Sequence, residues 1–153
     1  MKYKLVYAIA LLSIIIAVAC NKDKFVTKPT LTFKSINATR FIQGNEILMN
    51  VNVTDKEGDI QDTLFIYKLS RRCQRDTITF KIQMPTFPSN KNLEATIQAN
   101  FTYNLLNARY PFLGRSSKCG VNENDSCTFK FILKDKAGNR SDSVVSPEIV
   151  LVR

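Results

Sequence analysis

Two acidic segments of the chain follow one pattern. Residues 54–63 read TDKEGDIQDT and residues 134–143 read KDKAGNRSDS, so each places an aspartate, a lysine and a glycine ahead of a second aspartate. An aspartate at the start of a turn accepts a hydrogen bond from the backbone two residues on, and glycine supplies the positive φ that a tight turn needs. The repetition predicts two turns of the same design, and turn chemistry alone is enough to explain each.

The number of acidic side chains suggests a further role for these turns. Calcium binds six to eight oxygen atoms of carboxylates and carbonyls in a flexible geometry, and carboxylates that converge without a cation repel one another. The spacing is not that of an EF-hand, because Gly58 is the fourth residue of its loop rather than the sixth. If the turns lie together, we expect a calcium site built from these residues: Asp55, Glu57, Asp59, Asp62, Asp135, Asn139 and Asp142.

The elements that must position these turns are strands. After Pro29, apolar and polar residues alternate with period two, most clearly over residues 47–54 and 127–134. Read with their turn residues, the strands fall at about 30–36, 45–54, 63–72, 76–84, 92–104, 126–134 and 143–152. About seven short antiparallel strands predict an all-β, immunoglobulin-like antiparallel β-sandwich over residues 30–153. In that topology, both acidic turns lie at the same end.

The first residues of the chain indicate export. Two lysines precede an uncharged, largely apolar run that continues to residue 19, which is typical of a cleaved signal peptide over residues 1–19. The segment IAVAC, Ile16–Cys20, resembles the lipobox of bacterial lipoproteins, in which the cysteine thiol receives a diacylglycerol and the new amino terminus is acylated. The resemblance implies lipidation at Cys20, a lipidated tether over residues 20–29, and membrane lipid as a partner. Plain secretion and a retained signal anchor are the alternatives.

Three further cysteines remain once Cys20 is assigned to lipid. They are Cys73, Cys119 and Cys127, an odd number in an oxidising compartment, so at most one intramolecular disulfide forms. Cys119 and Cys127 bracket a short polar loop, and its closure stabilises the fold by only about 2–3 kcal/mol. Cys73 paired with either of them joins distant segments and stabilises more. The sequence leaves all of these pairings open.

Composition argues against catalysis and against nucleic-acid binding. The chain has no histidine to act as a general base and no tryptophan to stack on a sugar. A glycan hydrolase that uses the carboxylates of the 55–62 loop is an alternative, but an acid in an exposed turn lacks the burial that raises a catalytic pKa. The net charge is +9, or +7 without residues 1–19, yet no aromatic residues interleave the basic cluster around Arg71 and Arg72 as a single-strand binder requires.

Two segments carry a family resemblance. They read VTDKEGDI at residues 53–60 and FKFILKDKAGNRS at residues 129–141, the second followed by SPEI at residues 146–149. From about residue 28 onward the chain resembles the small immunoglobulin-like or cadherin-like lipoproteins of gram-negative bacteria. The resemblance implies a non-catalytic binding or accessory module of the cell envelope, anchored to the outer membrane on its periplasmic or surface face, with an envelope protein or a glycan as partner. A structural subunit of an envelope or surface complex is the alternative function.

Overall fold

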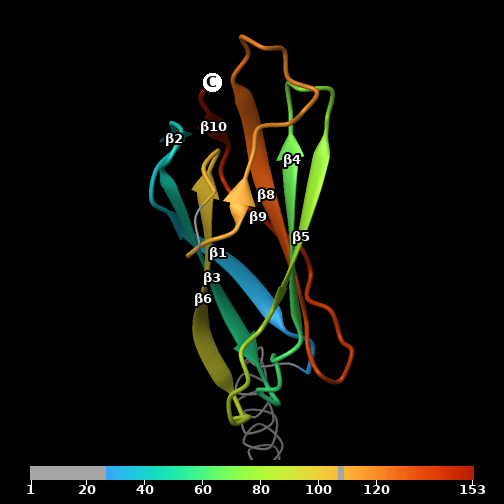
Figure 1. The fold of residues 1–153 in the computed structure, drawn as a ribbon. Coiled ribbons are helices and arrows are strands. Elements are labelled where there is room, and N and C mark those ends of the chain that lie inside the picture. Colours follow the sequence, from blue (N-terminus) through green and yellow to red (C-terminus); the bar gives the residue numbers. More distant parts are fainter. Residues whose placement is uncertain (1–26, 107–108) are drawn as a thin grey trace, which may run out of the picture.

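The chain folds into two β-sheets that pack face to face (Figure 1). The structure, a computed structural model, describes residues 27–106 and 109–153, and within these ranges the chain forms strands and loops but no helix. The described residues accordingly contain no helical segment that could cross a membrane. The predicted signal peptide and Cys20 lie outside the described residues. The all-β prediction is confirmed.

The first sheet has four strands in the order β1-β3-β6-β7. Strands β1, β3 and β6 pair antiparallel, and the short strand β7 pairs parallel to the end of β6. The bounds are Thr30–Ile36 for β1, Glu46–Asp55 for β3, Leu93–Tyr103 for β6 and Phe112–Leu113 for β7.

The second sheet has six strands, five of them in the order β2-β10-β8-β4-β5, with β9 pairing with β8. All neighbours pair antiparallel except β2 and β10, which are parallel. The bounds are Arg40–Phe41 for β2, Thr63–Ser70 for β4, Thr77–Gln83 for β5, Asp125–Lys134 for β8, Val144–Val145 for β9 and Ile149–Leu151 for β10.

The core lies between the two sheets, because buried and exposed side chains alternate along the strands. Every second residue of β3 from Ile47 to Val53 is buried, while the intervening residues stay partly exposed. The facing strands contribute aromatic rings, and Phe101 of β6 lies 4.7 Å from Phe80 of β5 and 6.3 Å from Phe129 of β8 between ring centroids. Burial of these apolar side chains is the main stabilising contribution to such a sandwich.

Strand number and direction differ from the prediction. The structure has ten strands rather than about seven, and both sheets are mixed rather than purely antiparallel. The predicted strand 143–152 is interrupted between β9 and β10, where Pro147 has no backbone N–H to donate to a ladder. β2 is parallel to β10 because the chain changes sheets after β1 and keeps its direction. The remaining predicted strands are confirmed to within a few residues.

The strands define two ends of the sandwich. We call the end formed by the β3–β4 loop, residues 56–62, and the β8–β9 loop, residues 135–143, the loop end. We call the opposite end the disulfide end; it carries residues 71–76 and 114–124. Thr63 pairs with Lys134 near the loop end and Ser70 pairs with Cys127 near the disulfide end. Figure 1 shows the carboxyl terminus beside β2 at the disulfide end.

Candidate metal centre at the loop end

The two acidic loops lie side by side, as the sandwich topology predicts. Lys136 N of the β8–β9 loop donates to Asp59 O of the β3–β4 loop over 3.0 Å. Each loop turns through a glycine at positive φ, 68° at Gly58 and 90° at Gly138. The sequence echo therefore reflects two turns of one design that contact each other directly.

The first aspartate of each loop closes its own turn. Asp55 ends β3, is fully buried, and its Oδ2 accepts from Gly58 N at 2.6 Å and Asp59 N at 3.3 Å. Asp135 is also fully buried, and its carboxylate accepts from Asn139 N at 2.7 Å and Asn139 Nδ2 at 3.0 Å. Turn closure explains why an aspartate begins each loop.

Turn closure does not explain the third carboxylate. Oxygen atoms of Asp55, Asp59 and Asp135 all lie within 4.8 Å of one another. Oδ1 of Asp55 and Oδ1 of Asp59 are buried and have no hydrogen-bond partner among the described residues. A buried charged oxygen without a partner is costly, so this geometry favours a ligand that neutralises the cluster.

The pKa of Asp55 also favours a cation at this cluster. Burial raises the pKa of Asp55, and the nearby charges of Asp59 and Glu57 add to the rise, while the hydrogen bonds from Gly58 and Asp59 oppose it. A divalent cation beside the three carboxylates would reverse this balance by favouring the ionised form. Carboxylate and carbonyl oxygens are the ligands that calcium prefers. The three side chains could therefore hold a calcium ion, with water or backbone oxygens completing its shell.

Four of the seven predicted ligands do not join this cluster as carboxylate ligands. Asp62 accepts from Lys134 Nζ at 2.9 Å and from Thr63 Oγ1 at 2.6 Å, and these contacts lower its pKa. Asp142 is exposed and accepts from Lys28 Nζ at 2.6 Å. Glu57 is exposed and accepts from Thr27 Oγ1, and Asn139 donates its amide Nδ2 to Asp135. Among the predicted ligands, Asp55, Asp59 and Asp135 are those whose carboxylate oxygens the structure brings together.

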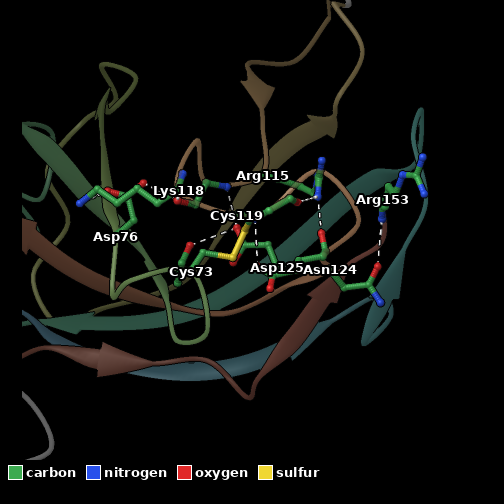
Figure 2. The surroundings of a disulfide bond; sticks show 12 residues. Cys73, Asp76, Arg115, Lys118, Cys119, Asn124, Asp125 and Arg153 are labelled. Carbon is green, nitrogen blue, oxygen red and sulfur yellow. Dashed lines mark hydrogen bonds and ion pairs between the residues drawn. A yellow bond between two sulfur atoms is a disulfide. The ribbon is translucent and has the colours of Figure 1, made fainter.

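The disulfide joins Cys73 to Cys119, which resolves the pairings left open by the sequence (Figure 2). The pair Cys119–Cys127 does not form, because Cys127 is fully buried in β8 beside Ile149 of β10. Burial raises the pKa of the Cys127 thiol to about 12. Cys127 is therefore an unreactive core residue rather than a disulfide partner.

A buried ion pair at the disulfide end was not predicted. Lys68 Nζ lies 2.5 Å from Asp125 Oδ2, and both side chains are fully buried. Asp125 Oδ2 also accepts from Ser70 Oγ and Ser116 N, while Lys68 Nζ donates to Gly114 O. The signal was present in the sequence, since Lys68 follows Leu64 and Ile66 at an inward position of the period-two pattern.

Comparisons with known proteins assign no family to the chain. No family model and no curated protein matches it. Its two-sheet β structure has a distant likeness to two solved structures. One is the sporulation control protein Spo0M of Bacillus subtilis, at 15% identity and a TM-score of 0.42, matched over 84% of this chain and 51% of that one. The other is a late embryogenesis abundant protein, at 11% identity and a TM-score of 0.45, over 99% of this chain and 87% of that one.

Proposed function

We propose that the chain is an exported, non-catalytic binding or accessory module of the bacterial cell envelope, anchored to a membrane through an acylated Cys20. The apolar amino-terminal run and the segment Ile16–Cys20 support this proposal most directly, and the point at which the chain enters the domain shows where an anchor would lie. Thr27 Oγ1 donates to Glu57, Lys28 Nζ contacts Asp142 at 2.6 Å, and Thr30 pairs with Thr54. The tether therefore joins the domain at the loop end.

Tether length then gives the anchored domain an orientation. Thr27 lies seven positions after Cys20, and an extended chain of seven residue steps spans at most about 25 Å. The loop end would accordingly face the bilayer, and the disulfide end would project away from it. The long sides of the sandwich would stay accessible to other molecules of the envelope.

The disulfide is consistent with export. Disulfides form and persist in the periplasm and at cell surfaces, and are rare in the cytosol. Cys73–Cys119 joins segments that are 46 residues apart, so it restrains a large part of the chain.

We further infer an immunoglobulin-like topology for the domain. In immunoglobulin constant domains, strands A, B, E and D form one sheet and C, F and G the other. Here β1, β3 and β6 correspond to A, B and E, and β4, β8 and β10 to C, F and G. β5 extends the second sheet beside C, as strand C′ does in variable domains. This correspondence supports the resemblance seen in the sequence.

A bound calcium ion at the loop end completes the proposal. It would link the β3–β4 and β8–β9 loops and make the membrane-facing base of the domain rigid. The buried oxygens of Asp55 and Asp59 that have no partner among the described residues favour it.

Lipidation is tested by metabolic labelling. Cells that express the full-length chain are fed an alkyne-tagged fatty acid, beside cells that express Cys20→Ser or Cys127→Ser. We expect label on the wild-type protein and on Cys127→Ser, and none on Cys20→Ser. Label that persists in Cys20→Ser, or a wild-type protein released to the medium without label, would contradict the anchor.

Calcium binding is tested by thermal melts of the full-length chain in detergent micelles, first in EDTA and then in calcium. A ligand that binds only the folded state stabilises it by about 2.7 kcal/mol at a concentration one hundred times its Kd. We expect Asp55→Asn and Asp135→Asn to abolish the calcium-dependent rise in Tm. Asp142→Asn is the matched control, because Asp142 is 94% exposed and lies outside the cluster, and it should keep the rise. A wild-type Tm that is the same in EDTA and in calcium would contradict the calcium site, and the two acidic motifs would then serve only to form turns.

A further inference from the structure

Strand β6 has a long free edge. It pairs with β3 along its whole length, whereas β7 pairs on its other side only with Thr102 and Tyr103. Within the described part of the chain, no strand pairs with that side between Leu93 and Phe101. An immunoglobulin constant domain has its D strand at this position. In this protein the chain instead passes from β5 directly to β6.

The direction of the free backbone groups follows from the hydrogen bonds at the end of β6. Tyr103 N donates to Asn45 O and Gly44 N donates to Tyr103 O, so the backbone of Tyr103 points toward β3. Thr102 N donates to Pro111 O on the opposite side. Because these directions alternate along a strand, the N–H and C=O groups of Thr96, Gln98 and Asn100 point to the free edge.

The other edges carry lysines, a proline or an irregular register that discourage pairing, whereas β6 carries a single charged residue, Glu94, near its start. β1 has an irregular register between Phe33 and Ser35 with Lys34 between them. β5 carries Lys81 and runs into Pro85 two residues after its end. β6 contains no proline, glycine or lysine, and its register with β3 is regular from Leu93 to Thr102. Edges without bulges, prolines or lysines are templates for another strand.

An apolar groove lies beside this edge, where the two sheets part. It has a volume of about 310 Å³ and separates β6 from β5 and the segment that follows β5. Ala95, Ile97 and Ala99 line it from β6, and Ile82, Met84 and Phe87 line it from the other side. The two alanines leave room for larger side chains. A strand added beside β6 would direct every second side chain into this groove.

We propose that the free edge of β6 binds an extended segment of a partner protein as an additional strand, with alternate apolar side chains in the groove. This proposal names the kind of partner for the binding module proposed above and rests on that function. Backbone hydrogen bonds would supply affinity, and the groove would select the apolar positions. The edge also has a charge preference, because Lys34 reaches Thr96 Oγ1 over 3.5 Å and Lys91 is exposed in the loop that leads into β6. Acidic residues at the partner's polar positions would complement these lysines.

A second copy of the chain fits this edge less well. Antiparallel pairing of β6 with itself would point the two loop ends in opposite directions, separated by roughly the 33 Å length of an eleven-residue strand. A tether that spans at most about 25 Å would then have difficulty in anchoring both copies in one bilayer. A partner segment that carries no such tether lacks this restriction.

Amide hydrogen exchange tests the proposal on the full-length chain in detergent micelles. The probe is a synthetic nonapeptide in which valine alternates with threonine and glutamate. We expect the peptide to slow exchange at Thr96, Gln98 and Asn100 at least tenfold, and to leave the amides of β5 unchanged. Ala95→Phe, which fills the groove, should weaken peptide binding at least tenfold. Val145→Phe is the matched control, because it places the same ring on an exposed site of the other sheet, and it should bind as the wild type does.

Gln98→Pro provides an independent variant if Ala95→Phe fails to fold, since it removes an outward N–H and leaves the groove intact. It too should weaken binding at least tenfold. Three results would overturn the proposal. They are unchanged exchange at millimolar peptide, equal protection by a peptide of the same composition with its valines clustered, and concentration-dependent protection without peptide, which would indicate a second copy. Failure here with normal labelling of Cys20 would leave the anchor in place.

Discussion

The two ends of the sandwich bury carboxylates in different ways. At the disulfide end, Asp125 is fully buried, and the cation that neutralises it is Lys68 of the neighbouring strand. At the loop end, Asp55 and Asp135 are equally buried, but the donors they receive are backbone amides and Asn139. Among the described residues, no lysine or arginine forms an ion pair with Asp55, Asp59 or Asp135. The chain supplies its own cation at the disulfide end, whereas the cation proposed for the loop end would come from solution.

Removal of the internal cation should have the largest effect on stability. Lys68→Met leaves the Asp125 charge buried and unpaired, and breaking a buried pair costs about 3–5 kcal/mol. We expect a large fall in the urea midpoint of Lys68→Met. The double variant Lys68→Met with Asp125→Leu should recover most of the loss, because it removes both charges. A single variant as stable as the wild type would show that the ends do not differ as described.

Removal of the disulfide should have the second-largest effect on stability. Cys73–Cys119 closes a separation of 46 residues, for which the chain-entropy model gives about 4 kcal/mol. Cys73→Ser and Cys119→Ser should each lower the free energy of unfolding by about 2–4 kcal/mol. The double variant should be no less stable than the poorer single variant, since one bond is lost in each case. Thermal melts with and without reductant measure this, and a wild type insensitive to reductant would contradict it.

The glycines of the two acidic loops offer a comparison within the loop end. Alanine at positive φ costs about 1–2 kcal/mol. A Cβ at Gly138 meets no atom within 4 Å, so Gly138→Ala should show that cost alone. A Cβ at Gly58 would lie 1.9 Å from Asn90 O, which adds an overpacking cost of about 1–3 kcal/mol. Equal urea midpoints for the two variants would mean that the β3–β4 loop is less tightly packed than the structure indicates.

The smallest expected effects on stability are those of lowering the pH, and they should differ in sign between Asp62 and Asp55. The pKa of Asp62 is lowered below 3.8, chiefly by the hydrogen bonds from Thr63 and Lys134, so its contribution to stability is present above that pH and lost as the pH falls below it. The pKa of Asp55 is raised, so its ionised form destabilises the apo protein at neutral pH and this cost disappears as the pH falls.

In EDTA at pH 7, we therefore expect Asp62→Asn to lower Tm slightly and Asp55→Asn to raise it slightly. At pH 3 both differences should shrink, because both carboxylates are then largely protonated in the unfolded chain. Melts of the three proteins at the two pH values measure this. A lower Tm for Asp55→Asn at pH 7 without calcium would count against the repulsion described for the loop end.

Patterns within single strands were the most predictable part of the fold. The period-two alternation located β3, β6 and β8 closely, because each of these long strands buries one face. The strands β2 and β7 were not predicted, since two residues carry no period and pair only because tertiary packing brings them to an edge. The last predicted strand failed at Pro147 for a reason that the sequence did contain.

The candidate site was predictable at the level of loops but not of atoms. The repeated motif identified the two loops that meet, and it named all three residues that cluster. It could not exclude Asp62, whose carboxylate is taken by Lys134 from the adjacent strand, or Asp142, which lies at the surface. Which carboxylates stay without a partner depends on side-chain directions that a one-dimensional pattern does not contain.

The position of Cys127 has a consequence for how the protein matures. Cys119 and Cys127 are only 8 positions apart in the sequence, whereas the native pair Cys73 and Cys119 are 46 positions apart. Short loops close more readily than long ones, so oxidation of the unfolded chain favours the wrong bond. Docking of β8 against β10 removes Cys127 from competition, because the thiol is then fully buried. Correct maturation thus requires β8 to fold before the thiols are oxidised, or an isomerase to reopen the bond that forms first.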